Sequence, residues 1–141
     1  MITEELKKIT DWLVSSGDMC FLAPAYDDDI SRFEYINKIT FPEQYKEWLM
    51  FSDGGEIFLP AGVQFYGVSH KPIIEVGDEN IPFDECIAIG SLSNGDPIIF
   101  KNGYEEIAIF NKEANRIEKD EVFENFFGFL NEIESILDIE I

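Results

Sequence analysis

A change in the spacing of apolar residues, at Ser52–Gly55, most constrains the fold of this chain. Upstream of this tetrapeptide, apolar residues recur every three or four positions, which is typical of amphipathic helices. Downstream they alternate or form short runs, which is typical of strands. The sequence Ser-Asp-Gly-Gly supplies glycines that end helices in a left-handed conformation. We therefore expect helices first and a sheet afterwards, in one α+β domain that spans residues 1–141.

Three helix starts are predicted upstream of this change. Thr3 precedes a segment whose apolar residues share one face, and it is a favourable N-cap. Asp27–Asp29 precedes the second helix, where carboxylates meet the positive end of the helix dipole. A calcium loop in this place would need Gly and Glu where Arg32 and Lys38 stand. Pro42, just inside a first turn, opens the third helix.

Short apolar runs separated by turn residues indicate the strands. Apolar residues alternate between 57 and 67, and later runs lie at 87–90, 97–100 and 107–110. Asn-Gly turns separate these later runs and favour antiparallel hairpins. From Asp120 onward, Phe and Leu recur at helical spacing, so one closing helix is predicted there. The expected fold is a central, mostly antiparallel, twisted sheet flanked by N-terminal helices and one C-terminal helix.

Charge decides which partners this surface attracts. Asp and Glu total 29 against 10 Lys and Arg, which gives a formal net charge of −19. Such a surface repels nucleic-acid phosphates and anionic membranes, and it attracts basic proteins. The alternative, that the charge only maintains solubility, stays open. A hydrophobic content of 45% indicates that the charge covers a folded body rather than a disordered chain.

The N-terminus and the cysteines predict a cytoplasmic protein. Acidic residues follow Met1 where a signal peptide needs basic ones, and no apolar run approaches the about 20 residues of a membrane span. Cys20 and Cys86 stand among apolar neighbours without metal-ligand spacing, so both are expected to be buried thiols. A disulfide between them is an open alternative that no pattern favours.

Patterns that indicate catalysis are scarce. His70 is the only histidine, so a metal site with two imidazole ligands is excluded, and a structural role is favoured for this loop residue. Gly54 and Gly55 follow a helix rather than a strand and therefore do not form a phosphate-binding turn. Paired carboxylates remain the open route to catalysis. We predict no enzymatic activity, no cofactor and no metal.

Acidic residues gather in loops and on the expected closing helix, which points to a binding surface. The segment 71–86 contains several carboxylates, and Lys71 is its only cation. Tyr104, beside an Asn-Gly turn, is the aromatic residue best placed to anchor a partner, whereas Trp48 is expected in the core. The candidate partner-binding residues are Asp53, Glu56, Glu75, Asp78, Glu79, Asp84, Glu85 and Tyr104.

Residues 39–49 resemble the Smi/Knr-like branch of the SUKH superfamily. They run Ile-Thr-Phe-Pro-Glu-Gln-Tyr-Lys-Glu-Trp-Leu, and Ser-Asp-Gly-Gly follows where the family ends in Asn-Gly-Gly. Further similarity lies at 87–90, 95–99 and 123–130, so the resemblance covers the chain from Ile30 onward. It implies an α+β fold with a mixed or antiparallel sheet. The positions that it implies to be fold-defining are Pro42, Trp48, Gly54 and Gly55.

The resemblance also implies a role. Bacterial proteins of this type resemble immunity proteins, which bind and neutralise a cognate polymorphic or contact-dependent toxin. A nuclease is the expected toxin, because an enzyme that grips phosphates is basic and an acidic surface competes for its groove. The alternative is a regulatory protein-binding scaffold, and a carboxylate-based hydrolase is a third possibility that the pattern gives no reason to prefer.

Overall fold

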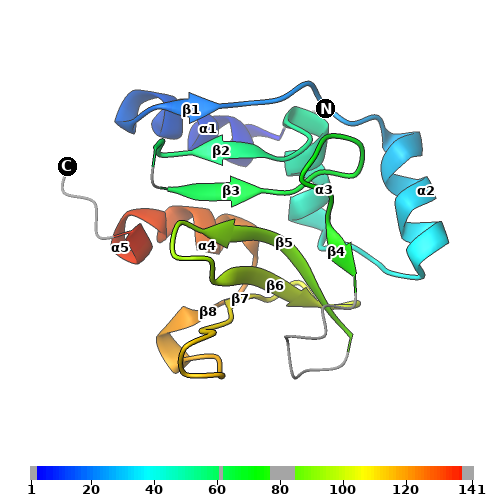
Figure 1. Cartoon of the computed structure of the whole chain (residues 1–141). Coiled ribbons are helices and arrows are strands. Elements are labelled where there is room, and N and C mark those ends of the chain that lie inside the picture. The colour runs from blue at the N-terminus through cyan, green and yellow to red at the C-terminus, as the bar shows by residue number, and fades with distance from the viewer. Residues whose placement is uncertain (1–2, 61, 77–84, 138–141) are drawn as a thin grey trace.

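The computed structural model describes residues 3–60, 62–76 and 85–137 (Figure 1). Helices and strands follow one another along these residues, and their bounds are given in chain order. They are α1 (Glu4–Ser16), β1 (Met19–Cys20), α2 (Asp27–Asn37), α3 (Glu43–Phe51), β2 (Gly55–Ile57), β3 (Val63–Phe65), β4 (Glu75–Val76), β5 (Cys86–Leu92), β6 (Pro97–Lys101), β7 (Ile107–Ile109), a 3-10 turn (Lys119–Glu121), β8 (Val122–Phe123), α4 (Phe126–Asn131) and α5 (Ile133–Leu137). Within the described ranges, no helix has the length and apolar character needed to cross a membrane.

The strands form one antiparallel sheet of eight strands, which confirms the predicted α+β fold. The strand order is β1-β2-β3-β5-β6-β7-β8, and β4 also pairs with β5. Strand β3 pairs with Gly90–Leu92 and β4 with Ile87–Ala88, so the two strands follow one another along β5. Helices α1, α3 and α4 cover one face of the sheet, and α2 stands at its edge (Figure 1).

The main core lies between the sheet and these helices, and aromatic rings fill its centre. Trp48 contacts Phe65 at a ring-centroid distance of 5.2 Å, and Phe65 contacts Phe126 at 5.4 Å. Tyr45 meets Phe126 at 4.9 Å. These contacts are edge-to-face, the arrangement in which aromatic pairs attract one another. They fix α3 and α4 against β3.

The predicted helix starts are found, with one difference at α3. Thr3 caps α1 through its side chain, and Asp27–Asp29 forms the first turn of α2. Pro42 is the N-cap of α3 rather than a residue of its first turn. A proline offers no side-chain acceptor, and the backbone N–H of Glu43 instead donates to both carboxylate oxygens of Glu105, at 2.9 and 3.1 Å.

The closing helix begins later than predicted. Residues 119–121 form a 3-10 turn, and Val122–Phe123 pairs with β7 as strand β8. The helix α4 starts at Phe126 because the Asn125 side chain accepts a hydrogen bond from Gly128 N at 2.7 Å. A break at Glu132 separates α4 from α5. The single helix predicted from Asp120 is therefore a strand followed by two short helices.

The prediction that both cysteines are buried is wrong for Cys20. Strand β1 lies at the edge of the sheet, and successive residues of a strand point to opposite faces. Met19 packs against the core, so Cys20 faces outward and is exposed. Cys86 is half-buried on β5, and both residues remain thiols.

Candidate partner-binding surface

The face of the sheet opposite the helices, called here the outer face, carries an apolar row. The register pairs Ala88 with Ile99, Ile99 with Ala108, and Ala108 with Val122. Glu75 on β4 pairs with Ala88 and extends this row by one position. Because residues opposite one another in a sheet point to the same face, the outer face presents an apolar strip that ends in a carboxylate.

Part of this strip is covered and part is open. Ala88, Ile99 and Phe110 form a small buried cluster that is separate from the main core. Ile117, from the segment that connects β7 to β8, packs onto this cluster, as does Tyr66 from beside β3. The connection therefore acts as a cover over one part of the outer face and leaves a groove beside it.

The groove has a volume of about 680 Å³ and combines an apolar floor with charged side chains. Tyr104 is 52% exposed and Val122 is 43% exposed, so an aromatic ring and an aliphatic side chain of the groove are accessible to a partner. The carboxylates of Glu85 and Glu106 are exposed beside them. The lining residues are Glu85, Cys86, Ile99, Phe100, Lys101, Tyr104, Glu106, Ala108, Ile117 and Val122. This composition is typical of a binding groove.

A tight turn between β6 and β7 presents the Tyr104 ring. The backbone N–H of Tyr104 donates to the carbonyl of Lys101 at 2.9 Å, and Gly103 adopts a φ of +88° that closes the turn. The ammonium of Lys101 lies 5.2 Å from the centroid of the Tyr104 ring, within the range of a cation–π contact. The face of this ring is thus already occupied by a cation.

Asn102 holds this turn in place from two sides. Its backbone N–H donates to the carbonyl of Glu85, the residue just before β5, at 2.9 Å. Its side chain accepts a hydrogen bond from Thr40 N at 2.7 Å and donates one to the carbonyl of Lys38 at 3.3 Å. Together with the hydrogen bonds from Glu43 N, at the start of α3, to the Glu105 carboxylate, these bonds hold the turn between the start of β5 and the connection from α2 to α3.

Negative charge also accumulates at the 3-10 turn before β8, where Asp120 and Glu121 line a pocket separate from the groove. Partial burial, followed by the charges of Asp120, Asp96 and Glu118, raises the pKa of the Glu121 carboxyl above its usual value. Like charges raise the pKa of an acid because they disfavour its ionised form. The same field that opposes ionisation of Glu121 attracts a cationic group.

The structure brings together some of the predicted partner-binding residues. Glu85 and Tyr104 line the same groove. Glu75 is exposed on the same outer face. Glu56 also points to this face, but it is half-buried on β2 and accepts a hydrogen bond from Gln64 at 3.3 Å. Asp78, Glu79 and Asp84 lie outside the residues that the structure describes.

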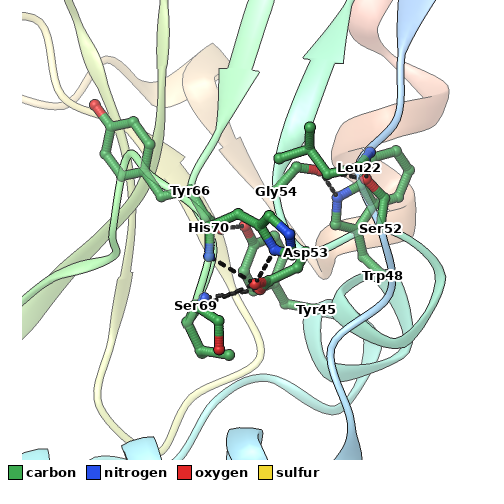
Figure 2. A network of polar contacts seen from close by, with 10 residues as sticks. Leu22, Tyr45, Trp48, Ser52, Asp53, Gly54, Tyr66, Ser69 and His70 are labelled. Carbon is green, nitrogen blue, oxygen red and sulfur yellow. Dashed lines mark hydrogen bonds and ion pairs between the residues drawn. The ribbon is translucent and has the colours of Figure 1, made fainter.

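The prediction that Asp53 faces a partner is wrong, because its side chain is fully buried. Its carboxylate accepts backbone hydrogen bonds from Val68 at 2.8 Å, Ser69 at 3.0 Å and His70 at 2.9 Å. His70 Nδ1 lies 2.8 Å from the same carboxylate, and Figure 2 shows how these groups converge on it. Asp53 therefore organises the loop after β3, and His70 has the structural role that the sequence favours.

Two of the residues expected to define the fold, Trp48 and Gly54, form a second part of this network (Figure 2). Trp48 is fully buried, and its indole N–H donates to the carbonyl of Gly54 at 2.9 Å. Gly54 has a φ of +99°, and a Cβ there would lie 2.8 Å from the carbonyl oxygen of Phe65. Any residue with a Cβ is therefore unfavourable at Gly54, because of the positive φ and because of the clash with the Phe65 carbonyl. The prediction that the glycines cap α3 is wrong: the helix ends at Phe51, and its C-cap is Ser52, in an extended conformation two residues before Gly54.

Sequence reasoning missed most of the groove, namely Cys86, Ile99, Phe100, Lys101, Glu106, Ala108, Ile117 and Val122. One signal was present at β7, where the small Ala108 stands between two isoleucines that point to the core. Alternation along a strand then places Ala108 on the opposite face. The remaining residues had no such signal, because their proximity depends on the register of four strands.

Comparison with known sequences agrees with this fold. A sequence profile of the SMI1/KNR4 family (SUKH-1) matches residues 24–132. The match runs from just before α2 to the end of α4 and includes every strand that lines the groove. No curated protein matches the chain at a significant level. Because the family profile covers most of its length, the chain belongs to the SMI1/KNR4 family (SUKH-1).

Proposed function

We propose that this chain is an immunity protein that binds and neutralises a cognate protein toxin through the outer-face groove. The observation that carries the proposal is the combination, in one groove, of an apolar floor, the exposed Tyr104 and the carboxylates Glu85 and Glu106. Aromatic anchors surrounded by charged residues are typical of protein interfaces. Membership in the family supports a protein-binding role.

The net charge of −19 supports a basic toxin as the partner. A surface of this charge attracts a basic partner and speeds its encounter, while the apolar floor supplies contact area that holds the complex. A nuclease is basic where it binds phosphates. We therefore propose a nuclease whose phosphate-binding surface meets the acidic outer face.

The proposal assigns no reaction to the chain. The imidazole of His70 is held by the buried Asp53 carboxylate, and Glu85 and Glu106 act as charges for a cationic partner. No cofactor and no metal enter this role.

Co-expression tests the proposal. The toxin encoded in the neighbouring reading frame is produced in bacterial cells with or without this chain, and survival is scored. We expect survival only with the chain present. A triple variant, Glu75→Lys, Glu85→Lys and Glu106→Lys, should lose protection because it reverses the charge of the outer face.

A control variant carries the same change in net charge elsewhere. Glu5→Lys, Asp18→Lys and Glu124→Lys alter exposed carboxylates that do not line the groove. This control should still protect, and circular dichroism should show that both variants fold. Death of cells that carry the unaltered chain would contradict the proposed function. Recovery of several weakly bound proteins, rather than the toxin, would favour the scaffold role.

A further inference from the structure

We infer that the groove recognises an arginine or lysine side chain within a short segment of the partner. The aliphatic part of that side chain lies on the apolar floor, and its cation replaces Lys101 at the face of Tyr104. The inference rests on the proposed function and specifies what the groove binds.

The contact between Lys101 and Tyr104 is the first argument. The Lys101 ammonium lies 5.2 Å from the ring centroid, and both side chains line the groove. The ring face is therefore presented to a cation inside the groove itself. Lys101 is exposed and has a long, flexible side chain, so it can move aside. A guanidinium is less strongly hydrated than an ammonium and stacks on aromatic faces, so it is well suited to replace Lys101.

The shape of the floor is the second argument. Ala108 is a small residue between Ile99 and Val122 in the outer-face row, and this deepens the groove at its centre. The methylene groups of a long basic side chain bury well on such an apolar surface while the charged end stays near water. A volume of about 680 Å³ also accommodates the residues on either side of the basic one.

The charge of the rim is the third argument. Two carboxylates, Glu85 and Glu106, line the groove, and Lys101 is the single cation among its lining residues in the described part of the chain. An anionic segment would meet net repulsion here. A second copy of this chain is also disfavoured as the occupant, because each copy carries a net charge of −19.

The test uses a blocked tripeptide, acetyl-Gly-Arg-Leu-amide, and its citrulline counterpart, which has nearly the same shape without the charge. The full-length chain carries ¹³C-labelled Ala, Ile and Val methyl groups. We expect saturable NMR shifts at Ala108, Ile117 and Val122 with the arginine peptide at millimolar concentration. Binding of the citrulline peptide should be roughly tenfold weaker, because its contact with the carboxylates is not charge-assisted.

Variants locate the binding in the groove. Ala108→Trp fills the floor from the outer face and should abolish the shifts at Ile117 and Val122. Ala114→Trp makes the same substitution at an exposed position outside the groove and should bind as the unaltered chain does. Glu106→Gln keeps the shape of the rim and should weaken the arginine peptide while leaving the citrulline peptide unchanged.

Three results would overturn the inference: no saturable shift with the arginine peptide, equal binding of the two peptides, or full binding by a folded Ala108→Trp variant. The co-expression assay separates this failure from failure of the proposed function. If the Ala108→Trp variant still protects cells, the toxin binds elsewhere: toxin neutralisation then stands, and its assignment to this groove fails. If the unaltered chain gives no protection, the proposed function itself fails.

Discussion

The acidic side chain of Asp53 is completely buried. Burial of a carboxylate is unfavourable by several kcal/mol unless hydrogen bonds replace its hydration. Here three backbone N–H groups and the His70 imidazole surround it. Asp53, two residues after the end of α3, therefore determines the path of the loop after β3, although the two segments are separated in the sequence.

The first prediction concerns that carboxylate. Asp53→Asn should destabilise the chain by about 2–4 kcal/mol, because the amide offers one acceptor oxygen and turns an N–H₂ group toward backbone donors. Urea denaturation measures the change. Asp18→Asn, at an exposed position, should change stability by less than about 0.5 kcal/mol. Equal urea midpoints for the two variants would contradict a stabilising role for Asp53.

The second prediction concerns the phenol of Tyr45, whose single O–H is shared between the carbonyls of Tyr66 and Ile89. Burial, and next the charge of Asp53, raises the pKa of Tyr45 well above its usual value. Tyr45→Phe should reduce stability at pH 8 by about 1–2 kcal/mol, because the Tyr66 carbonyl loses the phenol donor, whereas the Ile89 carbonyl still accepts the backbone N–H of Tyr66.

The same shift predicts a pH dependence. The unfolded phenol ionises near a pKa of about 10, whereas the folded phenol keeps its proton to higher pH. The contribution of Tyr45 is therefore complete below pH 10 and is lost as the pH rises toward the folded pKa. Urea midpoints measured from pH 8 to pH 11 should fall more steeply for the unaltered chain than for Tyr45→Phe. Parallel curves would show that Tyr45 ionises freely in the folded state.

Among helices and strands, those fixed by local spacing were predictable and those fixed by distant contacts were not. The helices α1 to α3 and the strands β5 to β7 follow from apolar periodicity and turn residues. Strand β8 was mistaken for helix because Phe123 keeps helical spacing with later residues, while its pairing with β7 is invisible in the sequence. In the candidate site, Glu85 and Tyr104 were predictable as exposed loop residues, but the apolar floor between them depends on strand register.

The third prediction concerns the start of α4. Asn125 caps this helix through the hydrogen bond from Gly128 N. Asn125→Ala should reduce stability by about 1 kcal/mol, whereas Asn125→Ser should retain most of it. Asn131→Ala, at the exposed end of the same helix, provides the matched comparison. If the two alanine variants unfold at the same urea concentration, α4 does not depend on its cap.

At the scale of the whole molecule, the dominant property is the excess of negative charge. A net charge of −19 makes the folded state repel itself, since folding brings the carboxylates closer together than they are in an open chain. Few of these charges are neutralised locally: among the described residues, ion pairs such as Lys7–Asp11 are exposed, and exposed pairs stabilise little.

The fourth prediction follows from this repulsion. Raising NaCl from low concentration to 1 M, where the Debye length is about 3 Å, should increase the urea midpoint of the chain. The control variant with Lys at positions 5, 18 and 124 carries less net charge and should gain less from salt. A midpoint that falls with NaCl would mean that attractive pairs outweigh the overall repulsion.

The bonds made by Asn102 bear on the speed of recognition. The turn that presents Tyr104 is tied to β5 on one side and to the connection before α3 on the other, before any partner arrives. Binding then needs no slow rearrangement, and stopped-flow rates should rise linearly with toxin concentration, with a slope that decreases as salt is added. Asn102→Ala should release the turn, so that the observed binding rate reaches a plateau at high toxin concentration. For the intact chain, collision and electrostatic steering set the time within which a toxin is captured.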